Sequence, residues 1–463
     1  MRVHISALGC KLNQAEAEAW ARQLEERGHR VVAKIEEADL HIVNSCAVTR
    51  EAVRDSDRAV RRGREKERLR TVLTGCAVGG ALRERSSTLD VEQVIANADK
   101  DRLVELLGAP MPGALTSAST AAAETVATET VATETAAAEG QRVGRAAPFQ
   151  QPGRRVRVAL KIEDGCSMSC AFCIIPGTRG AQRSRPAELV VAELVELEGR
   201  GYAEVVITGV QISAYHDRRW QLCDLVERML AATRRVRLRL TSIAPWQLDE
   251  RLFDLLRHPR VCRHVHLSLQ SGCEATLRRM RRPDRPARFA ALVSRLRREV
   301  PGIAITSDVI VGFPGEDEAE WRESVSFVRE MHFARLHVFR YSERPGTLGA
   351  ELPDPVPWPV RRERVSQMRE VAAEGERVFL EQRIGEVEEV VWERRQRGAW
   401  RGTSDNYVRV AVPVEDTGRA VRAGATAAEA PARGAVSAVR IVGRFGSSHA
   451  LGRLAGAGEV RMC

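Results

Sequence analysis

The first hundred residues alternate short apolar runs with a longer stretch of helical periodicity. Residues 3–8 form a β-like run, residues 13–27 have the spacing of an amphipathic helix, and Gly28 ends that helix. Further strand-like runs cover residues 40–44 and 71–74. Alternation of strands and helices at this spacing predicts a small parallel α/β domain, which we assign to residues 1–109.

The same alternation resumes in the middle of the chain, where helical stretches such as 187–199 and 287–298 separate the strand-like runs. Repeated strand–helix units favour a partial or complete parallel barrel over the alternative, a doubly wound open sheet. We assign this domain to residues 152–378. Its strand-like runs cover residues 156–162, 204–208, 236–240, 264–269, 304–311 and 336–339.

Two segments of different character flank this domain. Residues 110–151 are rich in Ala, Thr and Glu, with a repeated Glu-Thr-Val-Ala-Thr, which indicates a flexible linker more than an Ala-rich helix. After a helical stretch at 361–379, the tail carries strand-like runs at 387–392, 407–412 and 436–442. We expect residues 379–463 to form a small β-barrel.

Composition adds limits on compartment and partners. The chain has 463 residues and a formal net charge of +10, which favours a polyanionic partner. Only five of the basic residues are Lys, so the Arg bias is equally consistent with codon composition. The start lacks a signal-like apolar run and no membrane-length apolar run occurs, so we expect a cytoplasmic protein without a membrane partner.

Ten cysteines in a reducing compartment are poor disulfide candidates, and their spacing is the most informative feature of the chain. Cys166, Cys170 and Cys173 form a C-x3-C-x2-C cluster after the first strand of the central domain. Thiolate is the ligand that iron–sulfur clusters require, and three ligands leave one iron open to chelate S-adenosylmethionine. A structural zinc site is the alternative, but zinc prefers four ligands and no fourth Cys or His is nearby in sequence.

Three further cysteines each follow a predicted strand of the amino-terminal domain: Cys10, Cys46 and Cys76. The carboxyl ends of parallel strands share one edge of a sheet, where ligands gather. We therefore expect these three thiols to converge.

The cysteine motifs resemble those of the radical S-adenosylmethionine methylthiotransferases, a family with a central partial (β/α) barrel and a carboxyl-terminal OB-like TRAM domain. The resemblance covers nearly the whole chain except the linker. It rests on residues 8–14 (LGCKLNQ), 43–49 (VNSCAVT), 74–77 (TGCA), 164–180 (DGCSMSCAFCIIPGTRG), 267–272 (LSLQSG) and 307–316 (SDVIVGFPGE).

The resemblance implies two 4Fe–4S clusters with different roles. The cluster on Cys166, Cys170 and Cys173 cleaves S-adenosylmethionine reductively, and the cluster on Cys10, Cys46 and Cys76 carries the sulfur to be inserted. A second S-adenosylmethionine donates the methyl group, so that C–S–CH3 replaces C–H. The chemistry also requires a flavodoxin- or ferredoxin-like electron donor and a sulfur donor. The cofactor supplies the difficult chemistry while the protein positions it.

Several residues near strand ends are candidate contacts for S-adenosylmethionine. An alternative reading applies to each, because a Gly after a strand is often only a turn and polar residues also fill barrel interiors. His264 and His266 share one face of a strand, where core or surface roles are favoured over metal ligation. The candidate cofactor contacts are Phe172, Gly209, Gln211, Ser242, Ser268 and Gln270.

Two segments are candidates for RNA contact. A basic stretch at residues 54–70 either meets phosphates or forms a solvated helix face. Residues 402–407 (GTSDNY) resemble the TRAM motif, and Trp392 and Trp400 are further stacking candidates in an arginine-rich tail. The RNA-binding candidates are Arg401, Asp405, Asn406 and Tyr407.

Members of this family modify isopentenyladenosine in tRNA, threonylcarbamoyladenosine in tRNA, or an aspartate of a ribosomal protein. The sequences around Cys10 and Cys46 and residues 306–308 resemble the threonylcarbamoyl branch, whose substrate carries a carboxylate that an arginine is expected to bind. At residues 280–285 (MRRPDR) the chain departs from the basic–Tyr pair that the family more often has. Isopentenyladenosine is the alternative substrate, and a non-catalytic iron–sulfur redox sensor that binds RNA is the alternative of another class.

Overall fold

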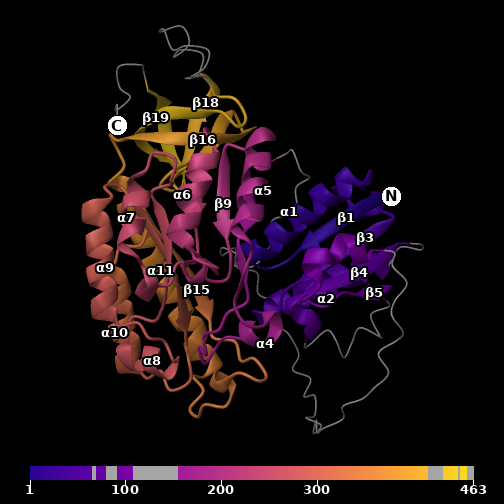
Figure 1. Ribbon diagram of the computed structural model, residues 1–463. Helices are drawn as coiled ribbons and strands as arrows, with labels where there is room; N and C mark the ends of the chain where they lie inside the picture. The colour runs from indigo at the N-terminus through magenta and orange to yellow at the C-terminus, as the bar shows by residue number, and fades with distance from the viewer. Residues whose placement is uncertain (65–68, 80–90, 108–154, 416–430, 447–448, 456–463) are drawn as a thin grey trace.

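The computed structural model describes residues 1–64, 69–79, 91–107, 155–415, 431–446 and 449–455. Figure 1 shows three parts: an amino-terminal sheet at the right, a central strand–helix domain, and a β-barrel at the top. The predicted linker at 110–151 lies outside the described residues. None of the described helices is both long and apolar enough to cross a membrane.

The amino-terminal domain is a five-stranded parallel sheet in the order β2-β1-β3-β4-β5, as the strand–helix alternation predicts. Its apolar core includes Ile5, Ile42 and Trp20, all nearly inaccessible to solvent. The strands are β1 Arg2–Ala7, β2 Arg30–Val31, β3 Leu40–Ser45, β4 Arg70–Gly75 and β5 Gln93–Val94, and the helices are α1 Lys11–Glu26, α2 Arg50–Arg64 and α3 Leu103–Leu106.

The central domain holds six long parallel strands in two hydrogen-bonded groups, β12-β9-β6 and β13-β14-β15. Parallel bridges from Leu238 to Val261 and from Ile243 to Leu267 join the two groups into an open barrel. This joining rejects the doubly wound alternative, since the strand order β6-β9-β12-β13-β14-β15 never reverses. The strands are β6 Arg157–Lys161, β9 Glu204–Thr208, β12 Arg237–Leu240, β13 His264–Gln270, β14 Ala304–Val311 and β15 Arg335–Arg340.

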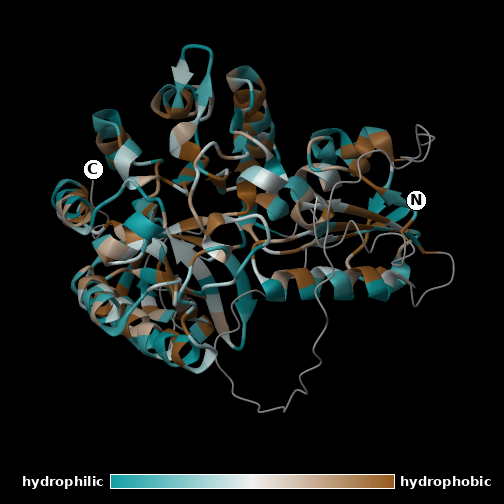
Figure 2. Ribbon diagram, turned by 90° about the horizontal axis from the view of Figure 1, so that it is seen from below, coloured by the Kyte–Doolittle hydropathy of each residue, from teal (hydrophilic) through white to brown (hydrophobic). Residues whose placement is uncertain are grey.

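Helices cover the outside of this barrel, and hydrophobic residues concentrate on the strands and on the helix sides that face them (Figure 2). The helices are α4 Ile175–Arg179, α5 Ala187–Gly199, α6 Leu222–Ala232, α7 Glu250–Arg257, α8 Glu274–Arg279, α9 Pro286–Glu299 and α10 Glu318–Glu330. Short antiparallel pairs β7 Glu163–Asp164 with β8 Arg183–Ser184, and β10 His216–Asp217 with β11 Trp220–Gln221, lie in the connections.

The tail forms a closed five-stranded barrel in the order β16-β17-β18-β20-β19, which confirms the predicted carboxyl-terminal barrel. Helix α11 leads into it, and the predicted domain boundary after residue 378 falls inside this helix. The sequence pattern missed β17 and β20. The elements are α11 Trp358–Glu381, β16 Val387–Gln396, β17 Ala399–Ser404, β18 Arg409–Pro413, β19 Val436–Phe445 and β20 His449–Leu454.

The amino-terminal domain packs beside the first strand of the open barrel. Helix α1 lies against β6, where the Glu18 carboxylate accepts hydrogen bonds from the Arg155 guanidinium at 2.9 Å and the Ala159 backbone N–H at 3.0 Å. On the other side, Arg340 of β15 pairs with Glu51 of α2 at 3.1 Å. The amino-terminal domain therefore contacts both edge strands of the barrel.

Candidate active site

The central cysteine motif forms an irregular loop between β7 and α4. The Cys166 backbone N–H donates to the Gly180 carbonyl at 3.1 Å, and the Cys173 N–H donates to the Cys170 carbonyl at 3.0 Å. Burial raises the pKa of the Cys173 thiol to about 12, and the neighbouring Cys170 and Cys166 add to the shift. Three half-buried thiols close enough to influence one another fit an iron–sulfur cluster with one open iron.

Arg282 joins this loop to strand β13. Its guanidinium lies 3.9 Å from the Cys170 sulfur, donates to the Ser268 carbonyl, and stacks 4.4 Å from the Trp246 ring centroid. This arginine stands in the segment where the sequence departs from the family pattern. A fixed cation here fits a site that holds thiolates, whose negative charge it offsets.

Gly209 and Gln211, predicted as cofactor contacts, follow β9 and surround the buried Glu163. A Cβ at Gly209 would lie 2.2 Å from a Glu163 carboxylate oxygen, so only glycine fits. The Gln211 backbone N–H donates to that carboxylate at 2.5 Å, while its side-chain amide reaches Gln247 at 2.7 Å. Burial raises the pKa of Glu163 to about 7, and its Oε2 atom has no hydrogen-bond partner among the described residues.

Glu163 is a candidate site residue that the sequence reasoning missed, although its place three residues before Cys166 could have indicated it. A buried carboxyl oxygen without a partner is costly unless a ligand satisfies it. Its position between the cysteine loop and the end of β9 fits a polar group of S-adenosylmethionine.

The other predicted cofactor contacts lie at the same end of the barrel. Ser242 and Gln270 have φ values of 52° and 76°, in the left-handed region that non-glycine residues rarely adopt. Ser268 is tied to the cysteine loop through Arg282. Phe172 is half-buried and packs on the apolar cluster that includes Phe313. The sequence prediction of cofactor contact at these positions stays a prediction.

The second cysteine set converges at the carboxyl edge of the amino-terminal sheet, as the strand topology predicts. Cys10 precedes α1, Cys46 follows β3, and Cys76 follows β4. A Cβ at Gly9 would lie 2.4 Å from the Cys46 sulfur, so the Cys10 loop approaches Cys46 closely. Burial raises the pKa of Cys46 to about 12, with Cys10 and Cys76 contributing. Three adjoining thiols on separate loops also fit a cluster with an open iron.

Arg179 links the two cysteine sets. It ends helix α4, which begins shortly after Cys173, and its Nε donates to the Cys76 sulfur at 3.1 Å. Its Nη1 donates to Glu16 at 3.0 Å and to Asp164 at 2.7 Å. The Arg179 side chain is almost completely buried, and contact with these groups raises its pKa against the effect of burial.

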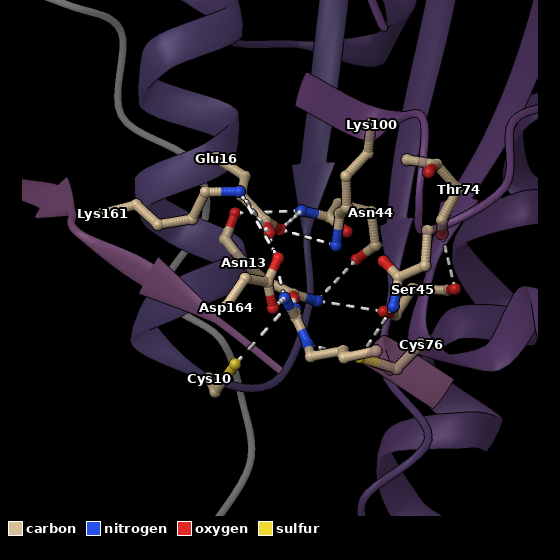
Figure 3. Close-up of polar contacts among 12 residues, drawn as sticks. Cys10, Asn13, Glu16, Asn44, Ser45, Thr74, Cys76, Lys100, Lys161 and Asp164 are labelled. Carbon is tan, nitrogen blue, oxygen red and sulfur yellow. Dashed lines mark hydrogen bonds and ion pairs between the residues drawn. The ribbon is translucent and has the colours of Figure 1, made fainter. Parts of the chain in front are cut away.

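Figure 3 shows the acidic groups of this network, Glu16 and Asp164, between Lys100 and Lys161 and beside Cys10 and Cys76. The Glu16 carboxylate lies 2.7 Å from the Lys100 ammonium. Burial opposes ionisation of Glu16, but Lys100, Arg179 and Lys161 outweigh it and lower the pKa of this carboxyl. The network therefore holds fixed charges where the two domains meet.

The TRAM-like motif lies in the carboxyl-terminal barrel, where it contacts the central domain. Asp405 and Asn406 are buried against the central domain: Arg263 pairs with Asp405 at 2.6 Å, and Asn406 donates to Glu388 at 2.8 Å. The turn between β17 and β18 faces the barrel of the central domain, so these side chains hold two domains together. Their burial does not fit the predicted RNA contact.

The rings of Tyr407 and Trp392 do not form the exposed surface that stacking with RNA bases requires. The Tyr407 ring lies 4.7 Å from the His264 ring and 5.4 Å from the Lys11 ammonium, inside the contact between domains. Trp392 is fully buried in the core of the small barrel. Arg401 is half-buried beside His449 at 3.3 Å, and its RNA contact stays a prediction.

Comparison with known proteins agrees with both cysteine sets. The Radical SAM superfamily model matches residues 160–328, and the model described as Uncharacterized protein family UPF0004 matches residues 2–96. The threonylcarbamoyladenosine tRNA methylthiotransferase MtaB of Thermotoga maritima is 32% identical, over 88% of this chain and 90% of its own length. The chain belongs to the radical SAM methylthiotransferase family.

Other methylthiotransferases have similar identity. The tRNA-2-methylthio-N(6)-dimethylallyladenosine synthase of Chlorobium luteolum is 30% identical over 87% of this chain and 89% of its own length. The ribosomal protein uS12 methylthiotransferase RimO of Roseiflexus castenholzii is 33% identical over 76% and 77%, respectively. Among solved structures, a radical S-adenosylmethionine methyltransferase, TsrM of Kitasatospora setae, has a TM-score of 0.50 at 15% identity over 75% of this chain and 76% of its own, a likeness of fold alone.

Membership in this family makes the chain a radical SAM enzyme, with a 4Fe–4S cluster and S-adenosylmethionine as its cofactors. The three thiols of the C-x3-C-x2-C loop fit such a cluster, because three ligands leave one iron open, and their assignment as its ligands stays a prediction. This membership rejects the non-catalytic sensor.

Proposed function

We propose that this methylthiotransferase converts threonylcarbamoyladenosine next to the anticodon of tRNA into its 2-methylthio derivative, using two 4Fe–4S clusters and two molecules of S-adenosylmethionine. The observation that carries the proposal is the bridge made by Arg179, which follows the Cys166–Cys173 loop by one short helix and donates to Cys76 at 3.1 Å. A bridge of this length supports close placement of the two metal centres.

When bound, the cluster on Cys166, Cys170 and Cys173 supplies the electron that cleaves S-adenosylmethionine, and the cluster on Cys10, Cys46 and Cys76 supplies sulfur. The protein offsets the negative charge of both thiolate sets with Arg282 and Arg179. The amino-terminal domain closes the open side of the barrel, which keeps water from the reacting carbon. An external electron donor of the flavodoxin or ferredoxin type and a sulfur donor complete the reaction.

Identity alone does not choose the substrate, since relatives acting on three different substrates match at 30% to 33%. The sequence around Cys10, GCKLNQAE, supports the threonylcarbamoyl branch, and two further MtaB relatives match at 30% and 32%. We propose that arginines of the small barrel, including Arg401, contact tRNA phosphates.

Mass spectrometry of nucleosides from tRNA tests this function in a strain that lacks the protein. We expect 2-methylthio-threonylcarbamoyladenosine to disappear and unmodified threonylcarbamoyladenosine to accumulate. The wild-type gene should restore the product, and a gene encoding Cys10→Ala should not. Loss of the methylthio group from isopentenyladenosine instead would assign the alternative substrate.

A further inference from the structure

Three adjacent strands of the central barrel each present a polar side chain that the reaction described above does not use. They are His266 on β13, Asp308 on β14 and His337 on β15. His266 Nε2 lies 3.2 Å from one Asp308 oxygen, and His337 Nδ1 lies 3.0 Å from the other. The flanking residues, such as Leu267 and Val309, are buried in the core under the helices. Because side chains alternate along strands, the three polar groups face the barrel interior.

A continuous row of contacts connects these groups with the loop of Cys10. Lys11 lies 3.4 Å from the Tyr407 hydroxyl, and the Tyr407 ring packs on His264. His264 and His266 lie 3.1 Å and 3.0 Å from the same Thr306 hydroxyl. The row therefore leads from the sulfur-carrying cysteines, through the interior of the barrel, to His337.

His337 is the member of the group that is open to a ligand. Its side chain is 48% exposed, compared with 15% for His266 and 24% for Asp308. Asp308 contacts its Nδ1 atom, and no hydrogen bond to its Nε2 atom is seen within the part of the chain that the structure describes. The Phe339 ring stands edge-on to it at 6.5 Å between centroids. The side chain thus offers one anchored nitrogen and one free nitrogen.

The surroundings favour an anionic ligand. Arg335 lies two residues before His337 on β15 and therefore on the same face of the strand, which places a positive charge on the side of the exposed ring. A carboxylate at Nε2 would give each ring nitrogen of His337 a carboxylate as its hydrogen-bond partner.

We propose that His337, positioned by Asp308, binds the substrate carboxylate of the threonylcarbamoyl group through Nε2–H. The inference rests on the proposed substrate. His337 is then a binding residue, and Asp308 is a positioning residue that fixes the orientation of the ring. Two imidazoles and a carboxylate whose ligand atoms lie within 4.8 Å of one another are also a set that binds divalent metals, which the test must separate.

The test compares two anticodon stem-loop RNAs, one carrying threonylcarbamoyladenosine and the other its carboxyl methyl ester. Reconstituted wild-type enzyme should methylthiolate the acid with kcat/KM about 10- to 100-fold above that for the ester, as expected for a charge-assisted hydrogen bond. His337→Phe should lose this preference, mainly through a higher KM for the acid. Asp308→Asn should lose part of it. His216→Phe, an exposed histidine on β10, is the matched control and should keep it.

Each outcome has one meaning. Wild-type enzyme that modifies neither RNA refutes the proposed function. Wild-type enzyme that modifies the acid and the ester equally overturns the carboxylate site without any variant, as does a His337→Phe enzyme that keeps the acid preference. A stoichiometric zinc that His337→Phe loses would also overturn it, since Asp308 would then ligate a metal.

Discussion

Replacing Arg179 by Met tests the charge network between the two cysteine sets most severely. The change removes the cation that contacts Glu16 at 3.0 Å, Asp164 at 2.7 Å and the Asn13 amide oxygen at 2.6 Å. Removing one partner of a buried ion pair costs about 3–5 kcal/mol, because a charge stays buried without compensation. In the variant Glu16 still pairs with Lys100 at 2.7 Å and Asp164 with Lys161 at 3.4 Å. The expected loss of stability is therefore at the lower end of that range, about 3 kcal/mol.

Urea unfolding of the anaerobic holoenzyme measures this cost. With a urea dependence of about 1–3 kcal/mol per molar, the midpoint of the first transition should fall by at least about 1 M. Arg200→Met is the matched control, because Arg200 also joins the two domains, pairing with Glu26 at 2.6 Å, but is 36% exposed. An exposed pair contributes about 0–1 kcal/mol. Equal midpoints for the two variants would refute the stabilising role of the buried network.

Four other predictions concern the clusters and the docking of the small barrel. Simultaneous Ala replacement of Cys166, Cys170 and Cys173 should halve the bound iron and abolish 5′-deoxyadenosine formation; cleavage that persists would refute the cluster assignment. Ala replacement of Cys10, Cys46 and Cys76 should leave that cleavage detectable but stop the methylthio product, and product at the wild-type yield would contradict the sulfur-carrying role. Glu204→Gln should make the carboxyl-terminal barrel more sensitive to limited proteolysis. The Glu204 carboxylate pairs with Arg237 and Arg239. These two arginines donate to four backbone carbonyls of the small barrel, at residues 389 and 403–405. Burial opposes ionisation of Glu204, but the adjoining arginines lower its pKa well below the usual 4.5. The contribution of Glu204 to stability should therefore be constant from pH 8 to pH 5 and decrease only as the pH falls below about 4.5. A decrease near pH 7 would contradict this.

Local patterns predicted much of the fold. The strand at Glu204–Thr208 and the helix at Ala187–Gly199 have the bounds that their apolar patterns predict, since each buries a regular face. Convergence of Cys10, Cys46 and Cys76 followed from the shared edge of a parallel sheet. Strand β17 was missed because its sequence, Ala-Trp-Arg-Gly-Thr-Ser, gains its burial from the closed barrel and not from an alternating pattern.

Contacts between distant segments account for the rest. Asp405 and Asn406 were predicted as RNA contacts, because nothing in their local sequence indicates Arg263 or Glu388 as partners. Likewise, the sequence of β15 does not indicate a special role for His337, because its contact with Asp308, and that of Asp308 with His266, joins three separate strands. Arg179 lies in the motif at residues 164–180, but its hydrogen bond to Cys76 depends on how the two domains pack and could not be predicted from that motif.

The most direct test of the central claim is mass spectrometry of nucleosides from two stem-loop RNAs, one with threonylcarbamoyladenosine and one with isopentenyladenosine. Both RNAs are incubated anaerobically with S-adenosylmethionine and the reduced, reconstituted enzyme. The account predicts 5′-deoxyadenosine together with a methylthio group on the threonylcarbamoyl nucleoside and none on the isopentenyl nucleoside. Methylthiolation of the isopentenyl RNA in preference to the other would contradict it.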